Sequence, residues 1–164
     1  SKYKNFDNLL KALSLSSSLL EDFKLICFGE ESLSIKEKYL IEKLKLNKKN
    51  IIFDSGDDYK LANYYLKATA LIYPSKNEGF GFPPLEAMSY NIPVIISKFC
   101  YFPDVEKYNA GIIVDLNVDS LYLAINKLLS NDNLRKQMGA NAFNLVKKSY
   151  DEDIIYDQIV RLYN

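Results

Sequence analysis

The segment from residue 70 to residue 88 constrains the fold of this chain more than any other. A short apolar run, Ala70 to Tyr73, is followed by a loop that contains two glycines, two prolines and two glutamates, and then by an apolar segment typical of a helix. Glycine lets the backbone approach a ligand closely, and the start of a helix offers N–H groups to a polar ligand. The segment therefore predicts a strand, a ligand-binding loop and a helix, in that order.

Short apolar runs alternate with helical patterns along the whole chain, which predicts an α/β fold. We expect a Rossmann-like parallel sheet with helices on both faces, because buried parallel strands read as continuous apolar runs. Ligands bind such sheets beyond the carboxyl ends of the strands, and the glycine-rich loop lies at such an end. The expected strands are residues 23–28, 51–53, 70–73, 93–96 and 111–114; the expected helices begin near residue 5 and cover 35–46, the region of 61–68, 85–90, 103–107, 121–129, 132–148 and 153–163.

Composition excludes several classes of protein. The chain has 164 residues, enough for one domain with a real core, and its 21 basic and 21 acidic side chains balance, which argues against a nucleic-acid-binding surface. It has no histidine, which excludes catalysis by a Ser-His or Cys-His pair. Its two cysteines, Cys27 and Cys100, form no spacing motif, so they argue against a zinc site and fit a reducing compartment. No apolar run is long enough to cross a bilayer.

Residues 77–88 read Asn-Glu-Gly-Phe-Gly-Phe-Pro-Pro-Leu-Glu-Ala-Met. This segment resembles the corresponding sequence of the retaining nucleotide-sugar glycosyltransferases of the GT-B type, the glycogen-synthase-like and mannosyltransferase-like group (glycosyltransferase family 4, group 1). The signature of that group is two glutamates separated by seven residues, matched here by Glu78 and Glu86. Residues 91–97, 103–105 and 110–115 also resemble segments of the family, so the resemblance covers nearly the whole chain.

The resemblance implies a role for several residues of this segment. Glu78 would face the donor sugar near the reacting carbon and act in catalysis, Glu86 would accept hydrogen bonds from the ribose hydroxyls, and Lys4 would contact the diphosphate. Each residue also has an ordinary explanation: Glu78 as an exposed loop carboxylate, Glu86 as a carboxylate favoured by the helix dipole, and Lys4 as a solvated lysine. The remaining residues that would bind the donor belong to the loop and the helix start: Gly79, Phe80, Gly81, Phe82, Pro84 and Leu85.

The two prolines predict where the helix after the loop begins. Pro83 precedes another proline, which disfavours helical backbone at Pro83, whereas Pro84 can be the first helical residue. We therefore expect Glu86 in the first turn, with the N–H groups of Leu85 and Glu86 directed at the diphosphate. Residues 53–56 resemble the loop that packs against the nucleotide base in the family, but Asp54 stands where a glycine is common. The sequence therefore does not predict which base is bound.

The resemblance also implies what the whole protein does. Residues 1–164 would be the nucleotide-sugar-binding C-terminal domain, and the N-terminal acceptor domain, together with a first strand and its arginine, is absent from this chain. The longer protein would transfer a hexose with retention from a UDP-, GDP- or ADP-sugar to a glycan or lipid-linked acceptor, without a metal or another cofactor. The isolated domain would be inactive, because its partner is the N-terminal domain of the same protein.

Glycan or cell-surface polysaccharide synthesis in the cytoplasm, or peripherally at the inner face of the membrane, is the expected setting. One alternative is a nucleotide-binding α/β module without transferase activity. Another is a nucleotide-sugar epimerase of the same GT-B architecture, although such enzymes normally depend on histidines, which this chain lacks.

Overall fold

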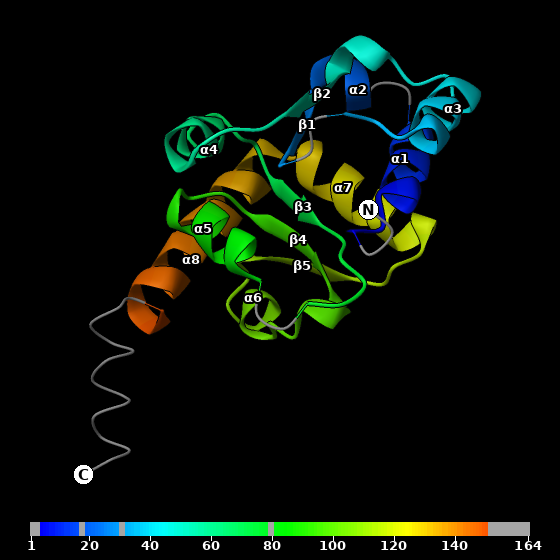
Figure 1. The fold of residues 1–164 in the computed structure, drawn as a ribbon. Coiled ribbons are helices and arrows are strands. Elements are labelled where there is room, and N and C mark those ends of the chain that lie inside the picture. The colour runs from blue at the N-terminus through cyan, green and yellow to red at the C-terminus, as the bar shows by residue number, and fades with distance from the viewer. Residues whose placement is uncertain (1–3, 17–18, 30–31, 79–80, 151–164) are drawn as a thin grey trace.

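The computed structural model describes residues 4–16, 19–29, 32–78 and 81–150, and in these ranges strands alternate with helices (Figure 1). The expected helix at residues 153–163 lies outside them. The strands are β1 (Leu25–Phe28), β2 (Ile51–Asp54), β3 (Leu71–Tyr73), β4 (Val94–Ser97) and β5 (Gly111–Val114). The helices are α1 (Phe6–Ser14), α2 (Leu19–Asp22), α3 (Ile35–Lys43), α4 (Asp58–Tyr65), α5 (Phe82–Ser89), α6 (Asp104–Lys107), α7 (Val118–Leu129) and α8 (Asp132–Ser149), with short 3-10 turns at Lys48–Asn50 and Lys98–Cys100.

Every strand pairing is parallel, which confirms the predicted α/β class. The strands form two sheets, however, where the sequence predicted one. β1 pairs with β2, and β3, β4 and β5 follow one another in a second sheet (Figure 1). Within the described residues no ladder joins β1 to β3. Apolar runs identify strands, but they do not reveal which strands lie close enough to pair, and this explains the difference.

Strand β4 separates two hydrophobic cores. Because side chains alternate along a strand, Ile95 faces one core and Val94 and Ile96 face the other. The Ile95 core is filled mainly by α1 and α7, and the opposite core by α5 and α8. All four residues of β4 are buried, so the three-stranded sheet is covered on both faces, as expected for a parallel sheet.

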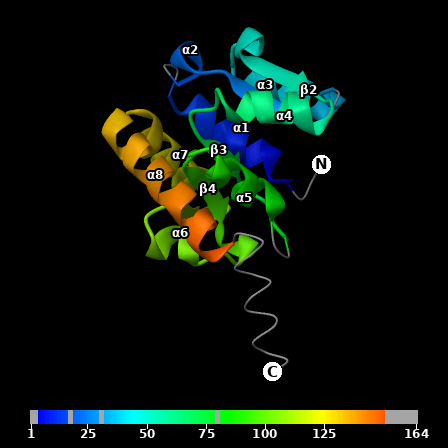
Figure 2. The ribbon, with the colours of Figure 1, turned by 90° about the vertical axis from the view of Figure 1, so that its left-hand side faces the viewer.

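Helix α8 connects the two cores. It lies beside α7 (Figure 2) and also packs against α5 and β5. Met138 belongs to the core of α1 and α7, whereas Ala142 and Leu145 belong to the core of α5. Between them Gly139 lies so close to the turn after α5 that an added Cβ would stand 2.1 Å from the carbonyl oxygen of Asn91. Only glycine fits there without a shift of the backbone.

Polar side chains fix the starts of several helices. Ser34 and Glu37 form a capping box at α3, and Asp57 and Asn117 cap α4 and α7 by accepting backbone N–H bonds. These three helices each follow the carboxyl end of a strand. Their starts, and the loops before them, therefore lie at the edge of the sheets where ligands of parallel α/β proteins bind.

Candidate functional site

Glu78 lies in the loop between β3 and α5, where two hydroxyl groups hold its carboxylate. The Tyr73 hydroxyl donates a hydrogen bond of 2.8 Å to Glu78 Oε1, and the Ser75 hydroxyl donates one of 3.0 Å to the same oxygen. Ser75 is buried and Glu78 is half-buried. Hydrogen bonds to an ionised carboxylate are stronger than those between neutral groups. Glu78 is therefore a positioned carboxylate and not the freely exposed loop residue of the ordinary explanation.

The loop that carries Glu78 is tied to the loop after β4. The buried Ser97 hydroxyl donates a hydrogen bond to the Ser75 carbonyl, and the Cys100 Sγ lies 3.9 Å from the Tyr73 carbonyl oxygen. Burial raises the pKa of the Cys100 thiol, and the charge of Glu78 adds to that rise. Cys100 is thus a buried neutral thiol that joins the two loops, close to the Glu78 carboxylate.

Helix α5 begins earlier than the sequence predicted. Its first residue is Phe82, with Gly81 as N-cap, so Pro83 and Pro84 occupy the second and third helical positions. The expectation that Pro84 opens the helix is wrong, because neither proline needs an N–H in the first turn. The N–H groups that precede the helical ladder are those of Gly81 and Phe82. The N–H groups of Leu85 and Glu86 lie within the ladder, and Glu86 is outside the first turn.

Glu86 differs from Glu78 in its surroundings. Its carboxylate is exposed and accepts one hydrogen bond, of 3.2 Å, from the hydroxyl of Tyr65 at the end of α4. Burial raises the pKa of the Tyr65 hydroxyl, and the negative charge of Glu86 raises it further. Tyr65 therefore keeps its proton and remains a donor to Glu86 through the physiological pH range.

The other residues expected to bind a donor are spread between surface and core. Phe82 is 69% exposed and Leu85 is half-buried, whereas Gly81 is buried and Pro84 is fully enclosed in the protein. Pro84 therefore shapes the loop from within the protein, and its expected part in donor binding stays a prediction. Gly79 and Phe80 lie outside the described residues.

A cavity of about 700 Å³ lies beside the Glu78 loop. It is lined by the start of α1, by the loop before α3 together with the first residues of that helix, and by Lys76 of the Glu78 loop. The loops after β1 and β3 therefore meet at one cavity, although their strands belong to different sheets. Lys4, in the turn before α1, directly precedes the lining residue Asn5. Lys76, a cation in this cavity, was not singled out by the sequence; its place in the loop after an apolar strand was the available signal.

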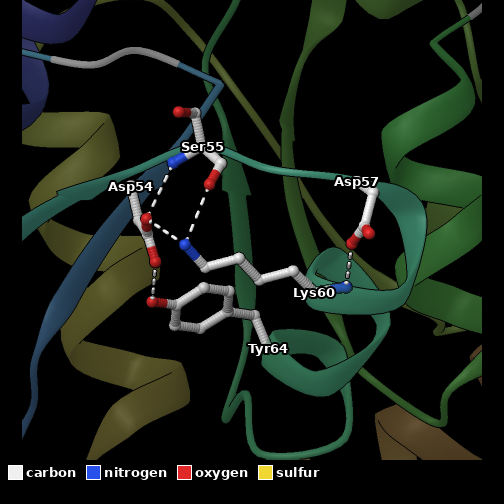
Figure 3. A network of polar contacts seen from close by, with 5 residues as sticks. All are labelled: Asp54, Ser55, Asp57, Lys60 and Tyr64. Carbon is white, nitrogen blue, oxygen red and sulfur yellow. Dashed lines mark hydrogen bonds and ion pairs between the residues drawn. The ribbon is translucent and has the colours of Figure 1, made fainter.

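Asp54, at the end of β2, is the centre of a polar network (Figure 3). Its carboxylate accepts hydrogen bonds of 2.5 Å from Lys60 Nζ, 2.5 Å from the Tyr64 hydroxyl and 2.9 Å from the Ser55 N–H. The Lys60 bond, followed by the Tyr64 bond, lowers the pKa of Asp54, and Asp54 in turn raises the pKa of Lys60. The residue that departs from the family's glycine therefore braces the loop between β2 and α4.

Two kinds of feature are missing from the part of the chain that the structure describes. Residues 4–16, 19–29, 32–78 and 81–150 contain no cluster of three or more His, Cys, Asp or Glu side chains that could hold a metal ion. Among the same residues, no helix combines the length and the apolar character needed to span a membrane.

Comparisons with known proteins agree on one family. The family model described as "Glycosyl transferases group 1" matches residues 1–145. An O-antigen chain mannosyltransferase of Salmonella typhimurium is 33% identical over 103 residues, which cover 63% of this chain and 29% of the relative. O-antigen chain mannosyltransferase B of Escherichia coli is 40% identical over 80 residues, covering 48% of this chain and 21% of the relative.

A solved structure extends the likeness to the fold. WaaG, a glycosyltransferase involved in lipopolysaccharide biosynthesis, superposes with a TM-score of 0.80 at 26% identity, over 93% of this chain and 40% of that protein. Its match confirms the GT-B type of architecture for this chain. The chain thus spans between about a fifth and two fifths of the length of these three proteins.

Proposed function

The chain belongs to the glycosyl transferases group 1 family, and we propose that it binds the nucleotide diphosphate sugar donor of a protein that transfers a hexose with retention of the anomeric configuration. The donor is a UDP-, GDP- or ADP-sugar. It lies at the carboxyl edge of the sheets, in contact with the loop between β3 and α5 and with the start of α5.

One observation carries the proposal. The two glutamates of the family signature stand on either side of the start of α5, one in the preceding loop and one within the helix, and both accept hydrogen bonds from tyrosine hydroxyls. A ligand that spans the start of α5 would reach a carboxylate at each end. A nucleotide sugar has hydroxyl groups at both ends and a diphosphate between them, which suits this arrangement.

Glu78 would serve the sugar end of the donor. As the diphosphate leaves, the donor carbon gains positive charge, and a fixed carboxylate nearby stabilises that charge as it develops. The hydroxyls of Tyr73 and Ser75 support this role, because they hold the carboxylate in place before the ligand arrives. A group that is already positioned loses little free energy to reorganisation during the reaction.

Glu86 would serve the nucleotide end. Its exposed carboxylate can accept hydrogen bonds from two ribose hydroxyls, since it has more acceptor sites than the one bond from Tyr65 occupies. The diphosphate between the two ends would be neutralised by Lys4 and Lys76 and by the N–H groups at the start of α5, without a metal ion. Lys76 lies close in the chain to Glu78 and lines the neighbouring cavity.

The relatives support a hexose donor and a surface glycan as product. Both curated relatives reported above are mannosyltransferases of O-antigen chains, and the solved relative acts in lipopolysaccharide biosynthesis. We extend this to a glycan or lipid-linked acceptor held with the help of an N-terminal domain of the same protein, in the cytoplasm or at the inner face of the membrane. The acceptor, the N-terminal domain and the location in the cell are predictions.

Calorimetry on the 164-residue chain tests donor binding with UDP, GDP and ADP and with UDP-glucose, GDP-mannose and ADP-glucose. Binding of one nucleotide series is the expected result, and binding of none of the six would overturn the proposal. Transfer is then tested with the longer protein, because we expect the chain alone to bind without transferring. Binding without any transfer by the longer protein would favour a nucleotide-binding module.

A further inference from the structure

Tyr101 has a backbone conformation that tyrosine rarely adopts. It follows the 3-10 turn after β4 with φ 47° and ψ 42°, which is the left-handed helical region. Five non-glycine residues of the described ranges have positive φ, and three of them are Asn5, Asn91 and Asn109. Asparagine tolerates this region, whereas a bulky side chain there is an outlier. Three of the other four positions with this conformation carry asparagine and the fourth carries Lys45, whereas position 101 carries a bulky tyrosine.

Packing does not explain the choice of tyrosine. The side chain of Tyr101 is 71% exposed, and within the described residues it makes no hydrogen bond or ring contact. Neighbouring residues of the same loop are buried, among them Cys100 and Phe102. A strained residue that gains nothing from the core is a candidate for a functional role, because such residues cluster at functional sites.

The position of Tyr101 supplies that reason. It directly follows Cys100, whose Sγ lies 3.9 Å from the Tyr73 carbonyl oxygen, and its loop is also held by the bond from Ser97 to the Ser75 carbonyl. Tyr73 and Ser75 are the two residues that hold Glu78. The backbone at Tyr101 is therefore anchored to the Glu78 end of the site, while its ring extends into solvent.

We propose that the Tyr101 ring contacts a hexose at the Glu78 end of the site and helps to position it for transfer. One face of a pyranose ring consists of C–H groups, and an exposed tyrosine ring offers a flat apolar surface with a polar tip that suits such a face. The inference rests on the proposed function. The hexose belongs either to the donor or to the acceptor, since both meet at the reacting carbon.

Tyr101→Asn tests the proposal, because it keeps the backbone conformation and removes the ring. We expect the melting temperature to rise by about 2–4 °C as the strain is relieved. By calorimetry, affinity for the nucleoside diphosphate should not change. If the ring contacts the donor sugar, affinity for the nucleotide sugar should fall at least fivefold. If the ring contacts the acceptor, the acceptor KM of the longer protein should rise by a similar factor, with little change in donor KM.

Two variants serve as controls. Tyr101→Phe keeps the ring and should retain both affinities. Lys45→Asn relieves the same left-handed conformation at the far end of α3, away from the site, and should change neither sugar affinity nor acceptor KM. If Tyr101→Asn leaves both sugar measurements unchanged, or weakens the nucleoside diphosphate and the nucleotide sugar equally, the proposal for Tyr101 is wrong. If the unsubstituted chain binds no nucleotide at all, the proposed function fails first.

Discussion

The two ends of the candidate site hold their carboxylates in opposite ways. Glu78 is half-buried and accepts hydrogen bonds from Tyr73 and Ser75, in a loop that is itself fastened to a second loop. Glu86 is exposed on a regular helix and accepts one longer bond from Tyr65. The first carboxylate is fixed before a ligand arrives, and the second can still adjust to one.

This difference suggests a division of labour. A group that stabilises charge only in the transition state benefits from being fixed, because movement during the reaction costs free energy. A group that binds the substrate equally well before and during the reaction needs only to reach it, and its loss raises KM without lowering kcat. The two glutamates should therefore produce different kinetic defects when they are changed.

The largest effect is expected at Glu78. Glu78→Gln keeps the shape and hydrogen-bonding reach and removes the charge, so kcat of an active protein that carries this chain should fall about 10²-fold or more. Donor affinity, measured by calorimetry, should change little. Glu21→Gln, at an exposed carboxylate of α2, is the control and should have normal turnover. Near-normal kcat in Glu78→Gln would mean that its carboxylate has no catalytic role.

The next effect is expected at Glu86. Glu86→Ala should weaken nucleotide binding by about 1–3 kcal/mol, the usual cost of losing hydrogen bonds to a charged group. In kinetic terms the donor KM should rise and kcat should change little. Asp119→Ala removes an exposed acidic residue from the start of α7 and controls for a general charge effect. If calorimetry shows unchanged nucleotide affinity in Glu86→Ala, Glu86 does not bind the ribose.

A smaller effect is expected when the support of Glu78 is weakened. Tyr73→Phe keeps the ring and deletes one of the two hydroxyl donors to the carboxylate. A single hydrogen bond contributes about 0.5–1.5 kcal/mol, so kcat should fall between about twofold and tenfold while donor affinity stays constant. If affinity falls and kcat does not, Tyr73 contacts the donor and does not act through Glu78.

The smallest effect is expected at Tyr65. Tyr65→Phe deletes the 3.2 Å bond to Glu86, which is longer than a hydroxyl donor usually makes. Because the Glu86 carboxylate is exposed, water can replace the lost donor, and nucleotide affinity should change by less than about threefold. A loss as large as that of Glu86→Ala would show that Glu86, like Glu78, depends on being fixed.

The sequence predicted the elements of the fold better than their assembly. Residues 93–96 were expected as a strand because they form a short apolar run, and the observed strand, Val94–Ser97, is buried on both faces of the sheet. The division into two sheets left no trace in the pattern. The start of α5 was misplaced because the rule for residues before proline describes an average, whereas Pro83 and Pro84 lie together in a first turn that needs no N–H.

For the candidate site, the sequence predicted the two glutamates but not the residues that hold them. Glu78 and Glu86 could be singled out because residues 77–88 as a whole resemble the signature of the family. The hydrogen-bond partners of the two glutamates could not be predicted. Tyr65 lies 21 residues before Glu86 and comes near it only because Tyr65 shares a hydrophobic core with Ala87 and Met88 of α5. Tyr73 and Ser75 are close to Glu78 in the chain, but a tyrosine at the end of a strand has no sequence signal that directs its hydroxyl toward a following loop.

The separation into two sheets has a consequence for how the molecule opens. The backbone of β4 is buried between two cores, so its amide hydrogens should exchange with solvent only when the whole domain unfolds, whereas β1, half-exposed along its length, should open at lower free energy. Hydrogen-exchange rates of the two strands would measure that difference. The cavity is lined by the loop after β1 and by Lys76 of the loop after β3, so a ligand bound there would slow exchange most in β1 and bring the two rates closer together.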